Sequence, residues 1–199
     1  MIYLIRHAPT EANMSGSMVK DYNSQPIIKF DTEAWHKKLP ELKDVKKVYI
    51  SDTLRTRQTA EALFPDAEIE VLDCLTEFDC SALGDKKFWE LTENEFNNLV
   101  HISPEEICCE CIKTFTRLNS LNRNSDVICI SHGMKIRALI HFYKKLIEGP
   151  FEPVKELSAY RIINSLDENF KNLDVCQINI KENSLKIINN EVETHKKES

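Results

Sequence analysis

Arginine, histidine, serine and glutamate side chains follow four short apolar runs of the chain. The residues are Arg6, His7, Ser51, Arg55, Glu77, Ser131 and His132. Two guanidinium groups can each hold phosphate oxygens through a pair of parallel hydrogen bonds. An imidazole nitrogen is a competent nucleophile, and a nearby carboxyl group can protonate a departing oxygen. These residue types predict phosphoryl chemistry.

The segment after His132 adds a second feature that suits an anion. Gly133 opens a stretch with helical periodicity, and a helix N-terminus presents backbone N–H donors and the positive end of its dipole. The chain carries neither a dinucleotide-binding glycine fingerprint nor a phosphate loop ending in Lys-Ser or Lys-Thr. The sequence therefore gives no support to NAD- or ATP-dependent chemistry.

The elements that must position these residues follow from hydrophobic periodicity. Strands are predicted at residues 2–5, 45–50, 68–72 and 127–130, and a hairpin at 175–180 and 185–188. Helices are predicted at 54–63, 103–121 and 134–146, with shorter ones around 32–39, 90–100 and 153–164, and residues 10–29 are predicted as a loop. Strands that alternate with helices indicate an α/β fold around a mainly parallel sheet. Because the carboxyl ends of parallel strands share one edge, the reactive side chains should meet there.

Composition limits the classes of protein that the chain can represent. Its 199 residues, of which 42% are hydrophobic and 29% charged, are typical of a single globular domain over 1–199. A net charge of −6 argues against nucleic-acid binding, which needs a basic surface. The apolar run at 2–5 is too short for a signal peptide, and no run approaches a membrane span, so we expect a cytoplasmic protein that binds no membrane. The polar end, 193–199, is expected to fray.

Seven cysteines in a chain without a secretion signal predict reduced, mostly buried thiols. Cys108 and Cys111 have the spacing of a metal-binding pair, but both fall on the apolar face of a predicted helix. A zinc site would need two further ligands, and no second Cys or His pair lies nearby in the sequence. We therefore expect no metal site.

Four motifs, in this order, resemble the histidine phosphatase superfamily, the phosphoglycerate mutase-like group, branch 1. Residues 6–13 (RHAPTEAN) are similar to its Arg-His-Gly-x-Thr-x-x-Asn signature, with Ala8 in place of glycine. Residues 51–60 resemble its second arginine motif, and residues 75–79 its acid-bearing segment. Residues 130–133 (ISHG) resemble its second histidine motif.

The resemblance implies a three-layer α/β/α sandwich and a two-step reaction without metal or other cofactor. His7 would attack the phosphoryl group to form a phosphohistidine, which water then hydrolyses. The side chains implied to hold the phosphoryl oxygens are Arg6, Arg55, His132 and Asn13. Glu77 would act first as acid and then as base. Beyond Glu77 the sequence departs from the family pattern, and Asp79 is the competing carboxylate.

The resemblance also implies that residues 78–103 form a variable cap segment. Mutases of the family carry extra Arg and Lys there to hold a second anionic group, whereas this segment has Lys86 and Lys87, no Arg, and Glu90, Glu93 and Glu95. The sequence therefore favours a phosphatase that acts on a small phosphorylated metabolite. The alternatives are a phosphoglycerate mutase-type transferase, a protein phosphatase acting on phosphohistidine or phosphotyrosine, and a non-catalytic module that binds a phosphorylated ligand.

Overall fold

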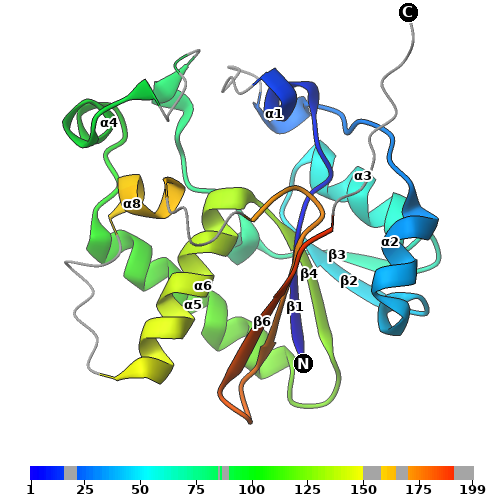
Figure 1. Ribbon diagram of the computed structural model, residues 1–199. Coiled ribbons are helices and arrows are strands. Elements are labelled where there is room, and N and C mark those ends of the chain that lie inside the picture. Colours follow the sequence, from blue (N-terminus) through cyan, green and yellow to red (C-terminus); the bar gives the residue numbers. More distant parts are fainter. Residues whose placement is uncertain (16–21, 85, 87–89, 150–157, 165–169, 191–199) are drawn as a thin grey trace, which may run out of the picture.

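Six strands form one sheet in the order β3-β2-β4-β1-β5-β6, seen nearly edge-on in Figure 1. The computed structural model describes residues 1–15, 22–84, 86, 90–149, 158–164 and 170–190. The strands are β1 (Ile2–Arg6), β2 (Lys47–Ile50), β3 (Glu68–Val71), β4 (Val127–Ser131), β5 (Val175–Asn179) and β6 (Ser184–Ile188). Neighbours among β3, β2, β4 and β1 pair in parallel, whereas β5 and β6 are antiparallel additions. The predicted mainly parallel sheet and C-terminal hairpin are confirmed.

Helices cover both faces of the sheet. They are α1 (Glu11–Ser15), α2 (Thr32–Lys38), α3 (Leu54–Leu63), α4 (Glu93–Leu99), α5 (Pro104–Leu121), α6 (Gly133–Glu148) and α8 (Ala159–Ile163). In Figure 1, α5 and α6 lie on one side of the sheet and α2 and α3 on the other. This arrangement is the expected three-layer α/β/α sandwich.

Alternation along β1 divides the core between the two layers. Ile2 and Leu4 belong to one cluster of buried side chains, which also contains apolar residues of α5 and α6. Tyr3 and Ile5 belong to the other cluster, together with Trp35 of α2 and residues of α3. Successive side chains of a strand point to opposite faces, so a continuous apolar run is what a central strand buried on both sides requires.

Local signals explain where several helices begin. The Ser103 hydroxyl accepts a hydrogen bond from the Glu106 backbone N–H, and the Glu106 side chain accepts one from the Ser103 N–H. This capping box satisfies two donors that a helix start leaves open. Asp31 caps α2, as predicted, and Thr53 caps α3 in the same way.

The predicted loop over 10–29 is wrong in part, because it contains α1 and a 3-10 turn, Tyr22–Ser24. Helix α1 has five residues and is held by a Thr10–Asn13 cap, which is too short a span for hydrophobic periodicity to reveal. Of the helix predicted at 153–164, the structure describes α8 alone. The predicted frayed tail, 193–199, lies outside the described residues.

Candidate active site

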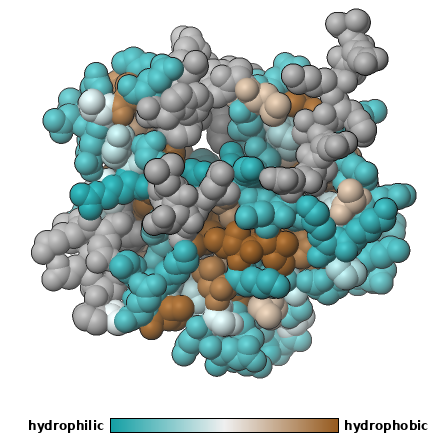
Figure 2. Space-filling view, viewed as in Figure 1, coloured by the Kyte–Doolittle hydropathy of each residue, from teal (hydrophilic) through white to brown (hydrophobic). Residues whose placement is uncertain are grey.

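The ends of three parallel strands bring the first reactive residues together. Arg6 of β1 pairs with Ser131 of β4, and the His7 backbone N–H donates to the Ser131 carbonyl at 3.0 Å. The Ser51 N–H donates to the carbonyl of Ile130 at 3.4 Å. These bonds fix the carboxyl edge of the sheet, where ligands of such folds bind. Figure 2 shows the molecule hollowed beyond this edge, between the regions of α1 and α4.

His7 is buried, with 1% of its surface exposed. Its Nδ1 lies 2.7 Å from the Ala8 carbonyl oxygen. Because a carbonyl only accepts, Nδ1 carries the proton and Nε2 keeps its lone pair. Burial first, then the charges of Arg55 and Arg6, hold the pKa of this imidazole well below its usual value of 6.5. The ring is therefore neutral near pH 7, with a lone pair on Nε2 that can act as a nucleophile.

His132 is held between Arg55 and Ser51. Arg55 donates from Nη2 and Nε to the His132 Nδ1, at 2.8 and 3.2 Å. Nδ1 is therefore an acceptor, so the ring proton sits on Nε2 and is donated to the Ser51 hydroxyl at 2.6 Å. The ring centroid lies 5.3 Å from that of His7. Burial and the Arg55 charge lower the pKa of His132 well below its usual value.

Arg6 lies against the start of α6. Its Nη1 donates to the Phe170 carbonyl at 2.7 Å. A Cβ added to Gly133 would lie 3.1 Å from both Cζ and Nε of Arg6. Glycine thus lets the guanidinium approach the first turn of α6 closely, which places a cation beside backbone N–H groups.

Glu77 caps α6 from a distant part of the chain. Its Oε1 accepts from the backbone N–H of Phe78 at 3.1 Å and of Lys135 at 2.8 Å, and its Oε2 accepts from Met134 at 3.1 Å. Burial raises the pKa of this carboxyl, although the three N–H donors and Arg55 oppose the shift. Within the described part of the chain, Oε2 has one donor against two for Oε1, so Oε2 is the oxygen with room for a proton.

Asp79, the competing carboxylate, lies in a different environment. It is exposed, and its Oδ1 accepts a hydrogen bond from the Ser81 N–H at 2.9 Å. Hydrogen bonds from Ser81 lower the pKa of Asp79. A proton donor benefits from a raised pKa, so the two environments favour Glu77.

The side-chain oxygen of Asn13 accepts hydrogen bonds from other residues of the protein. Its Oδ1 accepts from the N–H and the hydroxyl of Thr10, each at 3.2 Å. It also accepts from Nδ2 of Asn172 at 3.3 Å, and the same Nδ2 donates to the His7 carbonyl at 2.8 Å. Asn172 therefore joins two predicted site residues, and sequence reasoning missed it because it lies in an irregular stretch with no periodic signal.

Thr59 is a second residue that sequence reasoning missed. Its hydroxyl accepts from the Ala8 N–H at 2.9 Å and donates to the Arg55 carbonyl at 2.6 Å. It thus ties the loop after His7 to the helix that carries Arg55. The sequence shows only a threonine one helical turn after Arg55, and its partner Ala8 lies 51 residues away.

The described residues contain neither a candidate metal site nor a candidate membrane span. No group of three or more His, Cys, Asp or Glu side chains is arranged there to hold a metal ion. No helix in the same part of the chain is long and apolar enough to span a bilayer.

Solved structures share the fold at low sequence identity. A phosphoserine phosphatase from Entamoeba histolytica, in complex with 3-phosphoglyceric acid, aligns with a TM-score of 0.70 and 16% identity over 94% of each chain. A mutant of a phosphoserine phosphatase from that organism, in complex with phosphoserine, aligns with a TM-score of 0.69 and 16% identity over 94% of each chain. A phosphoglycerate mutase from Bacillus anthracis aligns with a TM-score of 0.56 and 16% identity, over 75% of this chain and 82% of that one.

A search of curated protein sequences finds no significant match. The model of the histidine phosphatase superfamily (branch 1) matches residues 2–154. That range contains the four strand ends and the predicted site residues Arg6, His7, Asn13, Arg55, Glu77 and His132, whereas Phe170 and Asn172 lie beyond it. The chain therefore belongs to branch 1 of the histidine phosphatase superfamily.

Proposed function

We propose that the protein is a phosphatase that hydrolyses a phosphomonoester through a phosphohistidine on His7. The observation that carries the proposal is the state of the His7 ring. Its proton is fixed on Nδ1 by the Ala8 carbonyl, so the lone pair of Nε2 is available. The charges of Arg55 and Arg6 act on the same ring. A neutral nucleophile beside two fixed cations is suited to attack on an anionic phosphoryl group.

The reaction would proceed in two steps, formation of the phosphohistidine and its hydrolysis. Nε2 of His7 forms a bond to phosphorus, the bond to the ester oxygen breaks, and that oxygen takes a proton from Oε2 of Glu77. The Glu77 carboxylate then removes a proton from water. The water oxygen bonds to phosphorus, the P–N bond breaks, and phosphate leaves with His7 neutral again. Acid and base catalysis by one such group contributes about 10²–10⁴-fold.

Arg6, Arg55 and His132 would surround the phosphoryl group. Charge-assisted hydrogen bonds of this kind contribute about 1.5–3 kcal/mol each. Asn13 has its Oδ1 occupied by donors, so Nδ2 is the atom that would donate to a phosphoryl oxygen. Arg6 is held by its hydrogen bond to the Phe170 carbonyl, and the Arg55 carbonyl accepts a hydrogen bond from the Thr59 hydroxyl. Both arginines are therefore in place before substrate binds. Such preorganisation is an effective source of catalysis, because the groups need not reorganise during the reaction.

The substrate class that we propose is a small phosphorylated metabolite. The similar solved structures hold 3-phosphoglyceric acid and phosphoserine, which are compounds of that class. We favour hydrolysis over mutase transfer because residues 78–103 contain no Arg and only two Lys. A mutase must bind a second anionic group while the phosphoryl group moves.

The test is hydrolysis of para-nitrophenyl phosphate in the presence of a chelator, by the wild type and by His7→Ala. We expect turnover by the wild type and a loss of at least about 10³-fold in the variant, because the covalent step is removed. Circular dichroism and urea unfolding establish that the variant is folded. A folded His7→Ala protein with most of its activity would refute the phosphohistidine route. Conversion of 3-phosphoglycerate to its isomer without phosphate release would favour the mutase instead.

A further inference from the structure

Lys135 is a buried cation directly behind the proposed proton donor. It lies in the first turn of α6, and 2% of its surface is exposed. Its backbone N–H donates to Oε1 of Glu77, while its side chain runs away from the site toward α5. A buried ammonium carries a large desolvation penalty unless other groups compensate it. Two groups do so here, and both belong to other elements.

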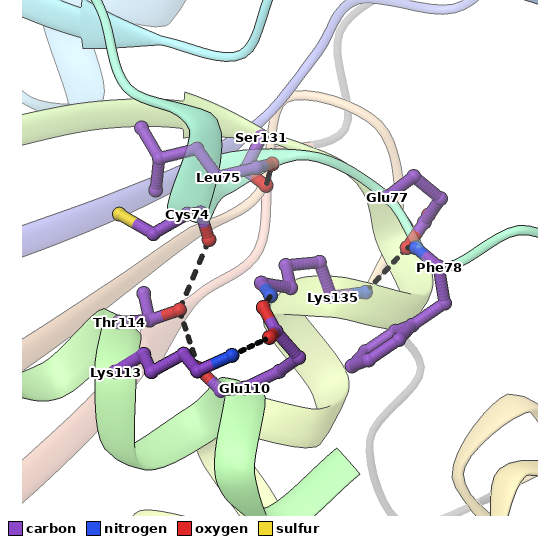
Figure 3. A network of polar contacts seen from close by, with 9 residues as sticks. All are labelled: Cys74, Leu75, Glu77, Phe78, Glu110, Lys113, Thr114, Ser131 and Lys135. Atoms are coloured by element: carbon purple, nitrogen blue, oxygen red, sulfur yellow. Dashed lines mark hydrogen bonds and ion pairs between the residues drawn. The ribbon is translucent and has the colours of Figure 1, made fainter. Parts of the chain in front are cut away.

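The first is the ring of Phe78, whose centroid lies 4.8 Å from the Lys135 Nζ. That distance is within the range of a cation–π interaction, which is stronger when the cation is desolvated. The second is Glu110 of α5, whose Oε2 lies 3.6 Å from the same Nζ. Figure 3 shows Lys135 between Glu110 and the segment that carries Glu77 and Phe78.

The segment that carries Glu77 is anchored on both sides of that residue. Its upstream half is tied by backbone carbonyls: Cys74 accepts from the Thr114 hydroxyl at 3.0 Å, and Leu75 from the Ser131 hydroxyl at 2.6 Å. Immediately downstream, Asp79 is exposed. Beyond it, Cys80 and Leu83 are buried in the core beside α5 and α6, and the Cys80 Sγ lies 3.6 Å from the Met134 Sδ. Phe78 is the residue that directly follows Glu77, and Lys135 contacts its ring.

We propose, on the basis of the proposed function, that Lys135 is a positioning residue. Its ammonium, paired with Glu110, clamps the Phe78 ring and so holds the Glu77 carboxyl on the N-terminus of α6, where it serves the leaving oxygen. An apolar side chain would fill the same volume without a desolvation penalty.

The kinetic test uses two aryl phosphates of similar size. Para-nitrophenyl phosphate has a good leaving group that needs little protonation, whereas phenyl phosphate depends on the acid. Lys135→Met should lower kcat for phenyl phosphate about tenfold and for para-nitrophenyl phosphate less than about threefold, because only the acid step is impaired. Lys135→Arg keeps the cation and should restore both rates. In a Glu77→Gln background, Lys135→Met should have no further effect on phenyl phosphate, since the group that it positions is gone.

A matched control is available on the same carboxylate. Lys113 binds Oε1 of Glu110 at 2.8 Å but is exposed and lies on α5. Lys113→Met should leave both rates unchanged. Equal losses on the two substrates by Lys135→Met, or losses that add to those of Glu77→Gln, would overturn the positioning role and leave Lys135 a purely structural residue.

Amide hydrogen exchange tests the same clamp without any turnover. The N–H groups of Phe78 and Met134 both donate to Glu77, so Lys135→Met should accelerate their exchange about tenfold or more. The N–H of Ile136, which donates to the His132 carbonyl, should be unaffected. Unchanged exchange at Phe78 and Met134 would refute the clamp. A wild type without phosphatase activity but with this exchange response would instead refute the proposed function and retain the clamp.

Discussion

Replacing Gly133 with alanine should lower catalytic activity but leave the stability of the fold almost unchanged. The added Cβ would lie 3.1 Å from Cζ and Nε of Arg6 and 3.4 Å from its Nη2. Ordinary carbon contacts lie at about 3.5–4.0 Å, so the guanidinium must recede by about 0.5 Å. It is bound at Nη1 by the Phe170 carbonyl at 2.7 Å, so the displacement must change how its remaining donors face the site.

The expected loss follows from the strength of one charge-assisted hydrogen bond, about 1.5–3 kcal/mol. With about 1.4 kcal/mol for each factor of ten in rate, Gly133→Ala should lower kcat/KM about 10- to 150-fold. The free energy of unfolding should change by less than about 1 kcal/mol. Alanine is the better helix former by roughly that amount, and the group that must move is the end of a flexible side chain.

Gly149, at the other end of α6, supplies a control in which stability should change and activity should not. Its φ is +137°, and an added Cβ would meet no atom within 4 Å. Gly149→Ala should therefore cost on the order of 1–3 kcal/mol of stability through backbone strain with kcat/KM unchanged. The assay is para-nitrophenyl phosphate kinetics and urea unfolding of both variants. A Gly133→Ala protein with normal kcat/KM would refute the idea that the close approach positions a phosphoryl ligand.

Two further predictions follow from the contacts of the site. Asn172→Ala removes two neutral hydrogen bonds, to His7 and Asn13, and should cost about 1–2 kcal/mol of stability and lower kcat/KM several-fold. Urea unfolding and steady-state kinetics check this, and wild-type values for both would contradict it. The pKa of both His7 and His132 is lowered by folding, so below about pH 6.5 the unfolded state binds more protons than the folded state. The two rings therefore leave the free energy of unfolding unchanged above pH 6.5. As the pH falls below 6.5, they lower it by up to about 1.4 kcal/mol per pH unit for each ring. The raised pKa of Glu77 acts with the opposite sign at lower pH, so the test compares the wild type with His7→Gln between pH 8 and 5. Parallel pH dependences of the two proteins would refute the assignment.

The sequence predicts the parts of the fold that depend on local signals. The continuous apolar run of β1, the capping residues of α2 and α5 and the turn between β5 and β6 are all local patterns. They are enough to place Arg6, His7 and His132 at one edge of the sheet, because the topology of parallel strands does the rest.

The remaining features depend on contacts between distant residues. Glu77 caps a helix that begins 56 positions further along the chain, since α6 starts at Gly133. Asn172 contacts His7 across 165 positions. A polar residue in an irregular stretch gives no sequence signal of such a partner. Helix α1 was missed for the opposite reason, because a five-residue helix has too few turns for periodicity to be detected.

The position of β1 in the sheet sets the order in which this protein can be assembled during synthesis. Strand β1 lies between β4 and β5, whose residues are made more than a hundred positions later. The ribosome adds about 5–20 residues per second, so His7 leaves it roughly 10–30 s before Asn172, 165 positions later. Throughout that interval the apolar β1 run has no strand partner on the β5 side. His7 therefore gains the hydrogen bond that its carbonyl accepts from Asn172 only after residue 172 has been made.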